Sequence, residues 1–324
     1  MSDLLKSFWS KLYAWALPSA LALGAYWFLI YPKTGFPAWL DDASDTTKVT
    51  IFAALTITIA FCLNAMSTPL YRILEGYLLW PGCLRRWGTN RQLRRKHQLK
   101  QDVAGVGLAR NLAVEKLAYY PLNDAQVAPT RFGNALRAFE SYGKSRFNLD
   151  SQTLWNEVSA VAPKYLQDQY ESARATVDFF VASVYLSAFF CIVALASAVR
   201  QDVDPELCVI AALAFAVMLL CRWMLVRVTR NWSLAVQAMV NLGRKKLAEA
   251  LGLQLPVSLQ AEQRMWGYFT SFVFYGNQEH GRNVDRYRER VKAASAGHER
   301  NAGTEAGEEG DGDDADGDGQ ASES

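Results

Sequence analysis

The apolar residues of this chain are gathered into four long blocks, which cover residues 12–31, 49–69, 178–199 and 207–226. A helix rises about 1.5 Å per residue, so about twenty apolar residues cross the hydrocarbon core of a bilayer. The fourth block contains Arg222 near one end, where a guanidinium can reach the lipid headgroups. Helices buried in a soluble core would give shorter runs with polar interruptions. The pattern therefore predicts an all-α, polytopic integral membrane protein with four transmembrane helices arranged as two hairpins.

The charged residues between these blocks predict the orientation of the chain. Residues 32–48 and 200–206 connect the two blocks of each hairpin, and each connection carries three acidic residues against two basic residues and one, respectively. Residues 81–101 carry seven Lys or Arg and no carboxylate, and residues 222–248 carry six and no carboxylate. Lys and Arg accumulate on the cytoplasmic side of membrane proteins. We therefore expect both termini and the long central region in the cytoplasm, and the absence of a cleavable leader favours a bacterial inner membrane.

The segments around the spans divide the chain into five regions. Residues 1–80 form the first hairpin with an interfacial segment at 70–80, and residues 176–228 form the second hairpin. Residues 81–175 are expected to form a basic, helical cytoplasmic module, and residues 229–294 a helical, partly amphipathic one. Residues 295–324 hold Gly, Glu and Asp with no large apolar side chain, so we expect a disordered acidic tail there.

Several helices of the cytoplasmic modules have sequence signals for their ends. Thr130 is placed to cap a helix that begins RFGNALRAFE. From Pro163 a helix can run without interruption into the third span, because proline suits the first turn of a helix. Met265–Gly276 is too short to span a bilayer and predicts a buried or interfacial helix, and Arg282–Ala294 predicts a charged, exposed helix.

The net charge of +2 combines a basic body with an acidic tail. Residues 297–324 hold ten acidic residues and one basic residue, which leaves 33 basic and 22 acidic residues elsewhere. The basic stretch at residues 85–100 can dock on anionic lipid, at about 1 kcal/mol per Lys or Arg, or serve only as an orientation signal. The expected partners are the bilayer and either further copies of this chain or another protein. Nucleic acid is not expected.

We find no sequence motif for catalysis, cofactor binding or metal binding. The histidines His97, His280 and His298 lie in unrelated polar segments, and the five cysteines include no CxxC pair. Asp314–Gly319 begins like a calcium-binding loop, but its twelfth position would fall after residue 324. Asp178 is either an intramembrane carboxylate with a function or the polar start of a helix in the headgroup layer. We therefore expect no catalytic, cofactor-binding or metal site, and no enzyme.

Three classes of function remain open at this point. The favoured class is a non-enzymatic scaffold, sensor or accessory subunit whose cytoplasmic helices engage a partner. The second class is an oligomeric ion channel or pore with a cytoplasmic helical domain. Two hairpins, separated and followed by cytoplasmic helices, resemble bestrophin-type anion channels in architecture alone. The third class is a membrane-embedded enzyme acting on lipid, which would need paired reactive groups that the sequence does not display.

Overall fold

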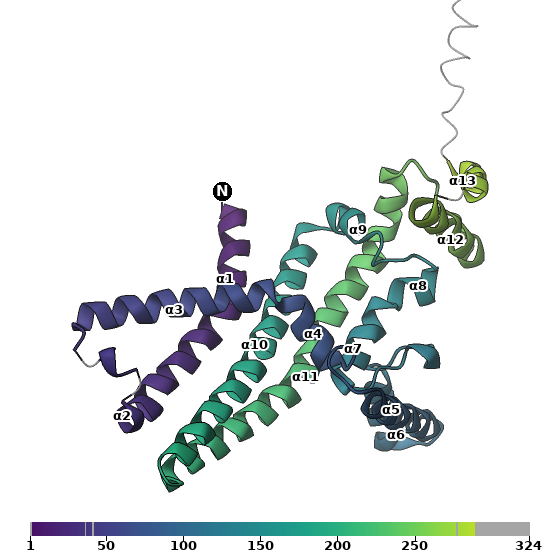
Figure 1. Ribbon diagram of the computed structural model, residues 1–324. Coiled ribbons are helices and arrows are strands. Elements are labelled where there is room, and N and C mark those ends of the chain that lie inside the picture. The colour runs from purple at the N-terminus through teal and green to yellow at the C-terminus, as the bar shows by residue number, and fades with distance from the viewer. Residues whose placement is uncertain (1, 36, 41, 277, 289–324) are drawn as a thin grey trace, which may run out of the picture.

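Figure 1 shows a computed structural model of the chain, which describes residues 2–35, 37–40, 42–276 and 278–288, with side chains from Tyr13 onward. The regular elements of these residues are all helices, apart from one isolated bridge between Leu253 and Arg288. Four of these helices are long and apolar enough to cross a membrane. The predicted all-α fold with four membrane-length helices is therefore confirmed.

The first hairpin is built from α1 (Ser2–Ala25) and α3 (Asp45–Ala65). α1 continues through a π-helical turn at Tyr26–Ile30 into α2 (Tyr31–Thr34), and a 3-10 turn at Ala38–Leu40 precedes α3. The first apolar segment therefore reaches a few residues beyond its predicted end at residue 31.

α3 ends at Ala65, four residues before the predicted end of the second span. Met66 has φ −88° and ψ 7°, and a separate helix, α4 (Ser67–Glu75), starts directly after it. α4 ends at Gly76, whose φ of 92° lies in the left-handed region that favours glycine. α4 then packs against α7. The segment predicted to lie at the interface is therefore held by a neighbouring helix.

The second hairpin consists of α10 (Lys164–Arg200) and α11 (Pro205–Ala250), which contain 37 and 46 residues. At about 1.5 Å per residue, both helices are much longer than a hydrocarbon core of about 30 Å. Pro163 directly precedes an uninterrupted α10, as predicted. Both helices therefore continue beyond their apolar segments, and Figure 1 shows α9 and α12 around the end of the hairpin that lies opposite its tip.

Contacts at the tip of α10 and α11 attach the first hairpin to the second. The ammonium group of Lys33 lies 3.5 Å from Oδ2 of Asp204 and also contacts the carboxylate of Glu206. The side-chain amide of Gln201 donates a hydrogen bond of 2.6 Å to the carbonyl of Lys33. α1 packs along α10, and α3 packs chiefly on α1. α1 and its continuation α2 therefore both attach the first hairpin to the second.

The membrane-length helices leave many large apolar side chains exposed. α3 is the least covered of the four, and Phe61 on it is 59% exposed. The two helices of the second hairpin show the same feature at Phe189, Ile192, Leu195, Leu213, Phe215 and Leu220. Exposed apolar surface of this extent is uncommon on soluble monomers. These four helices therefore indicate a membrane location.

Five helices lie between α4 and the second hairpin, and the last three of them pack on α11. They are α5 (Gly82–Val103), α6 (Gly107–Leu117), α7 (Arg131–Glu140), α8 (Tyr142–Phe147) and α9 (Trp155–Val161). α5 and α6 lie side by side, crosswise to α11 in Figure 1. Thr130 caps α7 as predicted, because its Oγ1 accepts a hydrogen bond of 3.0 Å from the backbone N–H of Gly133. The same hydroxyl donates to the carbonyl of Leu74 at 2.8 Å and so joins α7 to α4.

Two clusters of buried apolar side chains stabilise this arrangement. One cluster joins α4, α7, α10 and α11 through residues that include Leu70, Phe132 and Val236. The other joins α9, α11 and α12 through residues that include Val158 and Met239. The module predicted to be amphipathic thus begins within α11, at residue 229. The apolar face of this part of α11 packs against the helices that surround it.

The helices after α11 agree with the sequence prediction in part. α12 (Leu259–Tyr275) contains the predicted aromatic helix, whose Met265 and Trp266 are buried. α13 (Gln278–Val284) follows, and a 3-10 turn at Asp285–Tyr287 ends it.

The prediction of one charged helix over residues 282–294 is wrong in the part that the structure describes. The carbonyl of Tyr287 accepts a hydrogen bond of 2.7 Å from the backbone N–H of Gln254, and Arg288 pairs with Leu253. These backbone groups bond to another segment, so they cannot continue a helix. Residues 289–294 and the acidic tail at 295–324 lie outside the described residues.

Candidate functional site: an arginine cavity beside α11

A cavity of about 960 Å³ lies between the α5–α6 pair and α11. Its lining includes one carboxylate, that of Glu115, and seven basic side chains: Arg91, Arg95, Lys116, Arg131, Arg222, Arg227 and Arg230. We call this space the arginine cavity. Its basic residues come from α5, α6, α7 and α11, so it exists only in the folded chain.

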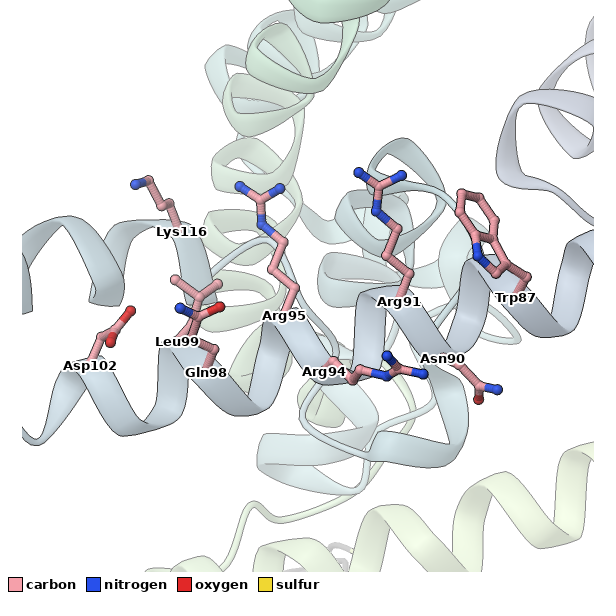
Figure 2. A pocket seen from close by; sticks show the side chains of 9 residues that line it. All are labelled: Trp87, Asn90, Arg91, Arg94, Arg95, Gln98, Leu99, Asp102 and Lys116. Carbon is pink, nitrogen blue, oxygen red and sulfur yellow. The ribbon is translucent and has the colours of Figure 1, made fainter.

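α5 contributes one of its faces to the arginine cavity. Trp87, Arg91, Arg95 and Leu99 follow one another at four-residue spacing, so they lie on one side of the helix. Figure 2 shows Trp87, Arg91 and Arg95 extending toward the same side of α5, with Lys116 of α6 nearby. The same four residues of α5, together with Lys116, also line a second hollow of about 530 Å³. The basic face of α5 is therefore accessible along several turns.

α11 contributes a wall that changes in character along its length. Leu219, Trp223, Val226 and Arg230 recur at helical spacing, so they form one stripe that lines the cavity. The guanidinium carbon of Arg227 lies 3.6 Å from the centre of the Trp223 ring, in a cation–π contact. The stripe begins within the predicted fourth span and ends beyond it. The wall is therefore mainly apolar on the membrane side, where Arg222 is its one basic residue, and basic on the other.

Most of the positive charge in the arginine cavity has no negative charge beside it. Among the residues that the structure describes, Arg230 is the one cavity cation in an ion pair, with 2.8 Å between its Nη1 and Oε1 of Glu115. Burial lowers the pKa of Arg131, and the nearby Arg95 and Arg91 lower it further. The guanidinium groups of Arg91 and Arg95 repel that of Arg131, because all three carry a positive charge. The cavity therefore has the electrostatic character of an anion-binding site.

Two close contacts hold α5 in the position that forms the arginine cavity. Lys96 is 1% exposed, and its Nζ donates hydrogen bonds of 2.5 Å to the carbonyl of Pro121 and to Oδ1 of Asp124. The Lys96 ammonium holds the pKa of Asp124 well below its usual range. A Cβ on Gly88 would stand 2.9 Å from the carbonyl oxygen of Pro129, closer than real Cβ atoms come. Glycine at this position therefore permits the close packing of α5.

The basic stretch at residues 85–100 does not act as one unit in the structure. Arg91 and Arg95 line the arginine cavity, whereas Arg85 and Arg86 border a separate hollow. Lys96 is buried in the loop contact described above. The stretch therefore contains both structural residues and residues that face a candidate site.

Asp178 takes part in a contact between α4 and α10. Its Oδ1 accepts a hydrogen bond of 2.7 Å from the hydroxyl of Tyr71, and its Oδ2 lies 4.0 Å from Nε of Arg174. The lining of the arginine cavity does not include it within the described residues. Asp178 lies well inside α10, which begins at Lys164, so the expectation that it marks a helix start is wrong. The geometry gives its carboxylate a structural role in the contact with Tyr71.

The other residues considered in the sequence lie apart from the arginine cavity. His97 contacts Asp124 at 3.0 Å, and the ring of His280 lies 5.5 Å from that of Tyr268. The five cysteines are free. No group of three His, Cys, Asp or Glu that could hold a metal ion occurs in the described part of the chain. His298 and the acidic loop at 314–319 lie outside it.

No known protein family matches this chain, and no curated protein or solved structure is significantly similar to it.

Proposed function

We propose that this chain is a non-enzymatic membrane protein of the scaffold, sensor or accessory-subunit class. It recognises a phosphate-bearing anion in the arginine cavity and engages a partner protein through the helices beyond its membrane-length segments. The observation that carries this proposal is the lining of the cavity by seven basic side chains and one carboxylate.

The type of cation favours phosphate as the recognised group. Six of the seven cavity cations are arginines, and a guanidinium can donate two parallel hydrogen bonds to a phosphate. Arg91 and Arg95 approach the space from α5, and Arg227 approaches it from α11. A phosphate between these walls would place negative charge beside guanidinium groups from both helices. Anion binding would then stabilise the contact between the α5–α6 pair and α11.

The position of the cavity supports a site at the membrane boundary. It lies where α11 passes from its apolar segment into its charged continuation, and Trp87 and Trp223 both line it. Tryptophan is enriched where membrane proteins meet the headgroup layer. We infer from the distribution of Lys and Arg that this boundary lies on the cytoplasmic side.

The partner surface in this proposal is the exposed end of α12. Val273, Phe274 and Tyr275 are exposed there, and Tyr275 is 75% exposed. Apolar groups exposed outside a membrane-length segment are typical of protein-binding surfaces. α11 runs from the arginine cavity to the helices that pack with α12, so one continuous helix connects the two places. This connection supports the sensor or scaffold class.

The proposal is tested by the thermal unfolding of the purified protein in a neutral detergent, with and without phosphate compounds. A ligand that binds only the folded protein raises the unfolding temperature. We expect sn-glycerol 3-phosphate or phosphatidic acid to raise it, and the double substitution Arg95→Gln with Arg227→Gln to abolish the rise. Arg110→Gln is the matched control, because Arg110 is exposed on α6 and outside the cavity lining.

Two results would contradict the proposal. If neither phosphate compound changes the unfolding temperature of the natural sequence, the cavity is not a phosphate site. If incubation converts the added lipid into a product, the protein is an enzyme and the non-enzymatic class is wrong.

A further inference from the structure

The apolar side chains on the α11 wall of the arginine cavity favour a lipid over a soluble anion as the ligand. We propose that the cavity binds an anionic phospholipid whose headgroup carries more than one negative charge. The headgroup lies between Arg91, Arg95 and Arg227, and an acyl chain lies along Leu219 and Trp223. This inference rests on the proposed recognition of a phosphate group and specifies the class of molecule that carries it.

Exposed apolar side chains form the membrane-side part of the cavity wall. Leu219 and Trp223 of α11 are each 48% exposed, and Leu112 of α6 is 43% exposed. All three line the cavity. A site for a soluble phosphate would gain nothing from large apolar groups left in contact with solvent. An acyl chain between α6 and α11 would cover them.

The order of the groups along α11 matches the order of the groups in a lipid. Leu219, Trp223 and Val226 come first, with Arg222 between the first two, and Arg227 and Arg230 follow without further apolar lining residues. Residues 219 to 230 cover about 16 Å of helix at about 1.5 Å per residue. A lipid that keeps its usual orientation in the leaflet would place its chain beside the first group and its headgroup beside the second. The site can therefore be filled directly from the membrane.

The size of the cavity indicates a ligand larger than a free phosphate, and its charge indicates a headgroup with more than one negative charge. Its volume of about 960 Å³ lies near the upper end of the range of about 300–1,000 Å³ for small-molecule sites. An inorganic phosphate would fill a small part of this space. Arg91, Arg95, Arg131 and Arg227 have no ion pair with any carboxylate among the described residues. A headgroup with two or more negative charges matches them better than a singly charged or zwitterionic one.

Competition among defined ligands tests this inference. The purified protein in neutral detergent is offered dihexanoyl phosphatidic acid, dihexanoyl phosphatidylcholine and sn-glycerol 3-phosphate, and bound species are counted by native mass spectrometry. We expect phosphatidic acid to bind at least about tenfold more tightly than either of the other two, a difference of about 1.4 kcal/mol. Glycerol 3-phosphate carries the same phosphate without chains, and phosphatidylcholine carries the same chains without net charge.

A pair of substitutions on α11 tests the role of the apolar wall. Leu219→Trp fills the membrane-side part of the cavity, so it should remove the preference for phosphatidic acid over glycerol 3-phosphate. Leu220→Trp is the matched control, because Leu220 is exposed on the same turn and outside the cavity lining. Both positions are exposed, and an unchanged unfolding temperature without ligand shows that the variants fold.

The outcomes separate this inference from the proposed function. If glycerol 3-phosphate binds as tightly as phosphatidic acid, and Arg95→Gln weakens both, the phosphate site stands and the lipid inference is wrong. If phosphatidylcholine binds as tightly as phosphatidic acid, the charge-based part of the inference is wrong. If no phosphate compound binds, both the inference and the proposed function fail.

Discussion

The hydroxyl of Tyr71 donates a hydrogen bond of 2.7 Å to Oδ1 of Asp178. Tyr71 lies on α4 and Asp178 lies inside α10, where its apolar segment begins, so the bond joins the helix after the first hairpin to the second hairpin. Burial raises the pKa of Tyr71 well above its ordinary value, and the charge of Asp178 raises it further. Tyr71 is therefore a neutral hydrogen-bond donor at any ordinary pH. The carboxylate at the start of the third span has a structural role in this contact.

Tyr71→Phe should destabilise the contact between the two hairpins. The substitution removes a hydrogen bond to a charged group and keeps the ring, so we expect the free energy of unfolding to fall by about 1.5–3 kcal/mol. Denaturation of the purified protein in mild detergent measures this change. Tyr165→Phe is the control, because Tyr165 lies exposed on α10. Equal stability of the two variants would show that the bond contributes nothing.

Glu75 should make the stability depend on pH near neutrality. It is buried at the end of α4, and burial, followed by the charge of Glu140, raises its pKa from 4.5 to about 7. Between these two values the folded protein holds a proton that the unfolded chain releases. The free energy of unfolding therefore falls as the pH rises through this window, by about 3 kcal/mol in total.

Glu75→Gln should remove this pH dependence. The variant should be more stable than the natural sequence at pH 8, by about 1–3 kcal/mol, because an amide has no charge to bury. Unfolding midpoints between pH 5 and pH 8 measure the effect. Glu171→Gln, at an exposed position on α10, should leave the pH profile unchanged. If the stability of Glu75→Gln varied with pH in parallel with that of the natural sequence, Glu75 would not be the source of the pH dependence.

Gly88→Ala should displace α5 from Pro129. The added Cβ would stand 2.9 Å from both Cβ and the carbonyl oxygen of Pro129. We expect a cost of about 1–3 kcal/mol from this overpacking, together with weaker binding of phosphate compounds. Gly82→Ala on the same helix meets no atom within 4 Å. It should be neutral or slightly stabilising, because alanine favours helix over glycine.

Lys96→Met should loosen the loop that follows α6. It leaves the carbonyl of Pro121 without its buried donor, so we expect the free energy of unfolding to fall by about 2–3 kcal/mol. Lys100→Met is the matched control, because exposed Lys100 lies 3.4 Å from the same carboxylate of Asp124. An exposed pair contributes little, so its loss should cost less than about 1 kcal/mol. Equal effects of the two substitutions would contradict the role given to Lys96.

The lengths of the membrane-spanning helices and the starts of several helices depend on local sequence patterns, so they could be predicted from the sequence. Apolar length identified the four membrane-length helices, Pro163 marked the start of α10, and the hydroxyl of Thr130 marked the start of α7. The end of α3 was missed because residues 66–69 carry no charge that would mark the break at Met66. Apolar length alone cannot locate such a break.

The arginine cavity could not be predicted, because its walls are distant in the sequence. Arg91 and Arg95 line the same cavity as Arg227 only in the folded chain, where α5 and α11 form opposite walls of it. The four-residue spacing of Trp87, Arg91 and Arg95 was a visible signal for one basic face. The stripe of Leu219, Trp223 and Val226 was a signal for the other wall. Nothing in either pattern indicates that the two faces meet.

The most direct test of the account is the side of the membrane on which two exposed positions lie. Asp42→Cys and Gln98→Cys are introduced singly into a cysteine-free version of the chain, and intact cells are treated with a membrane-impermeant maleimide. We expect the cysteine at position 42 to be labelled in intact cells, and the cysteine at position 98, beside the arginine cavity, to be labelled only after the membrane is permeabilised. Labelling of both positions from the same side would contradict the four-helix threading and the place of the cavity on the cytoplasmic side.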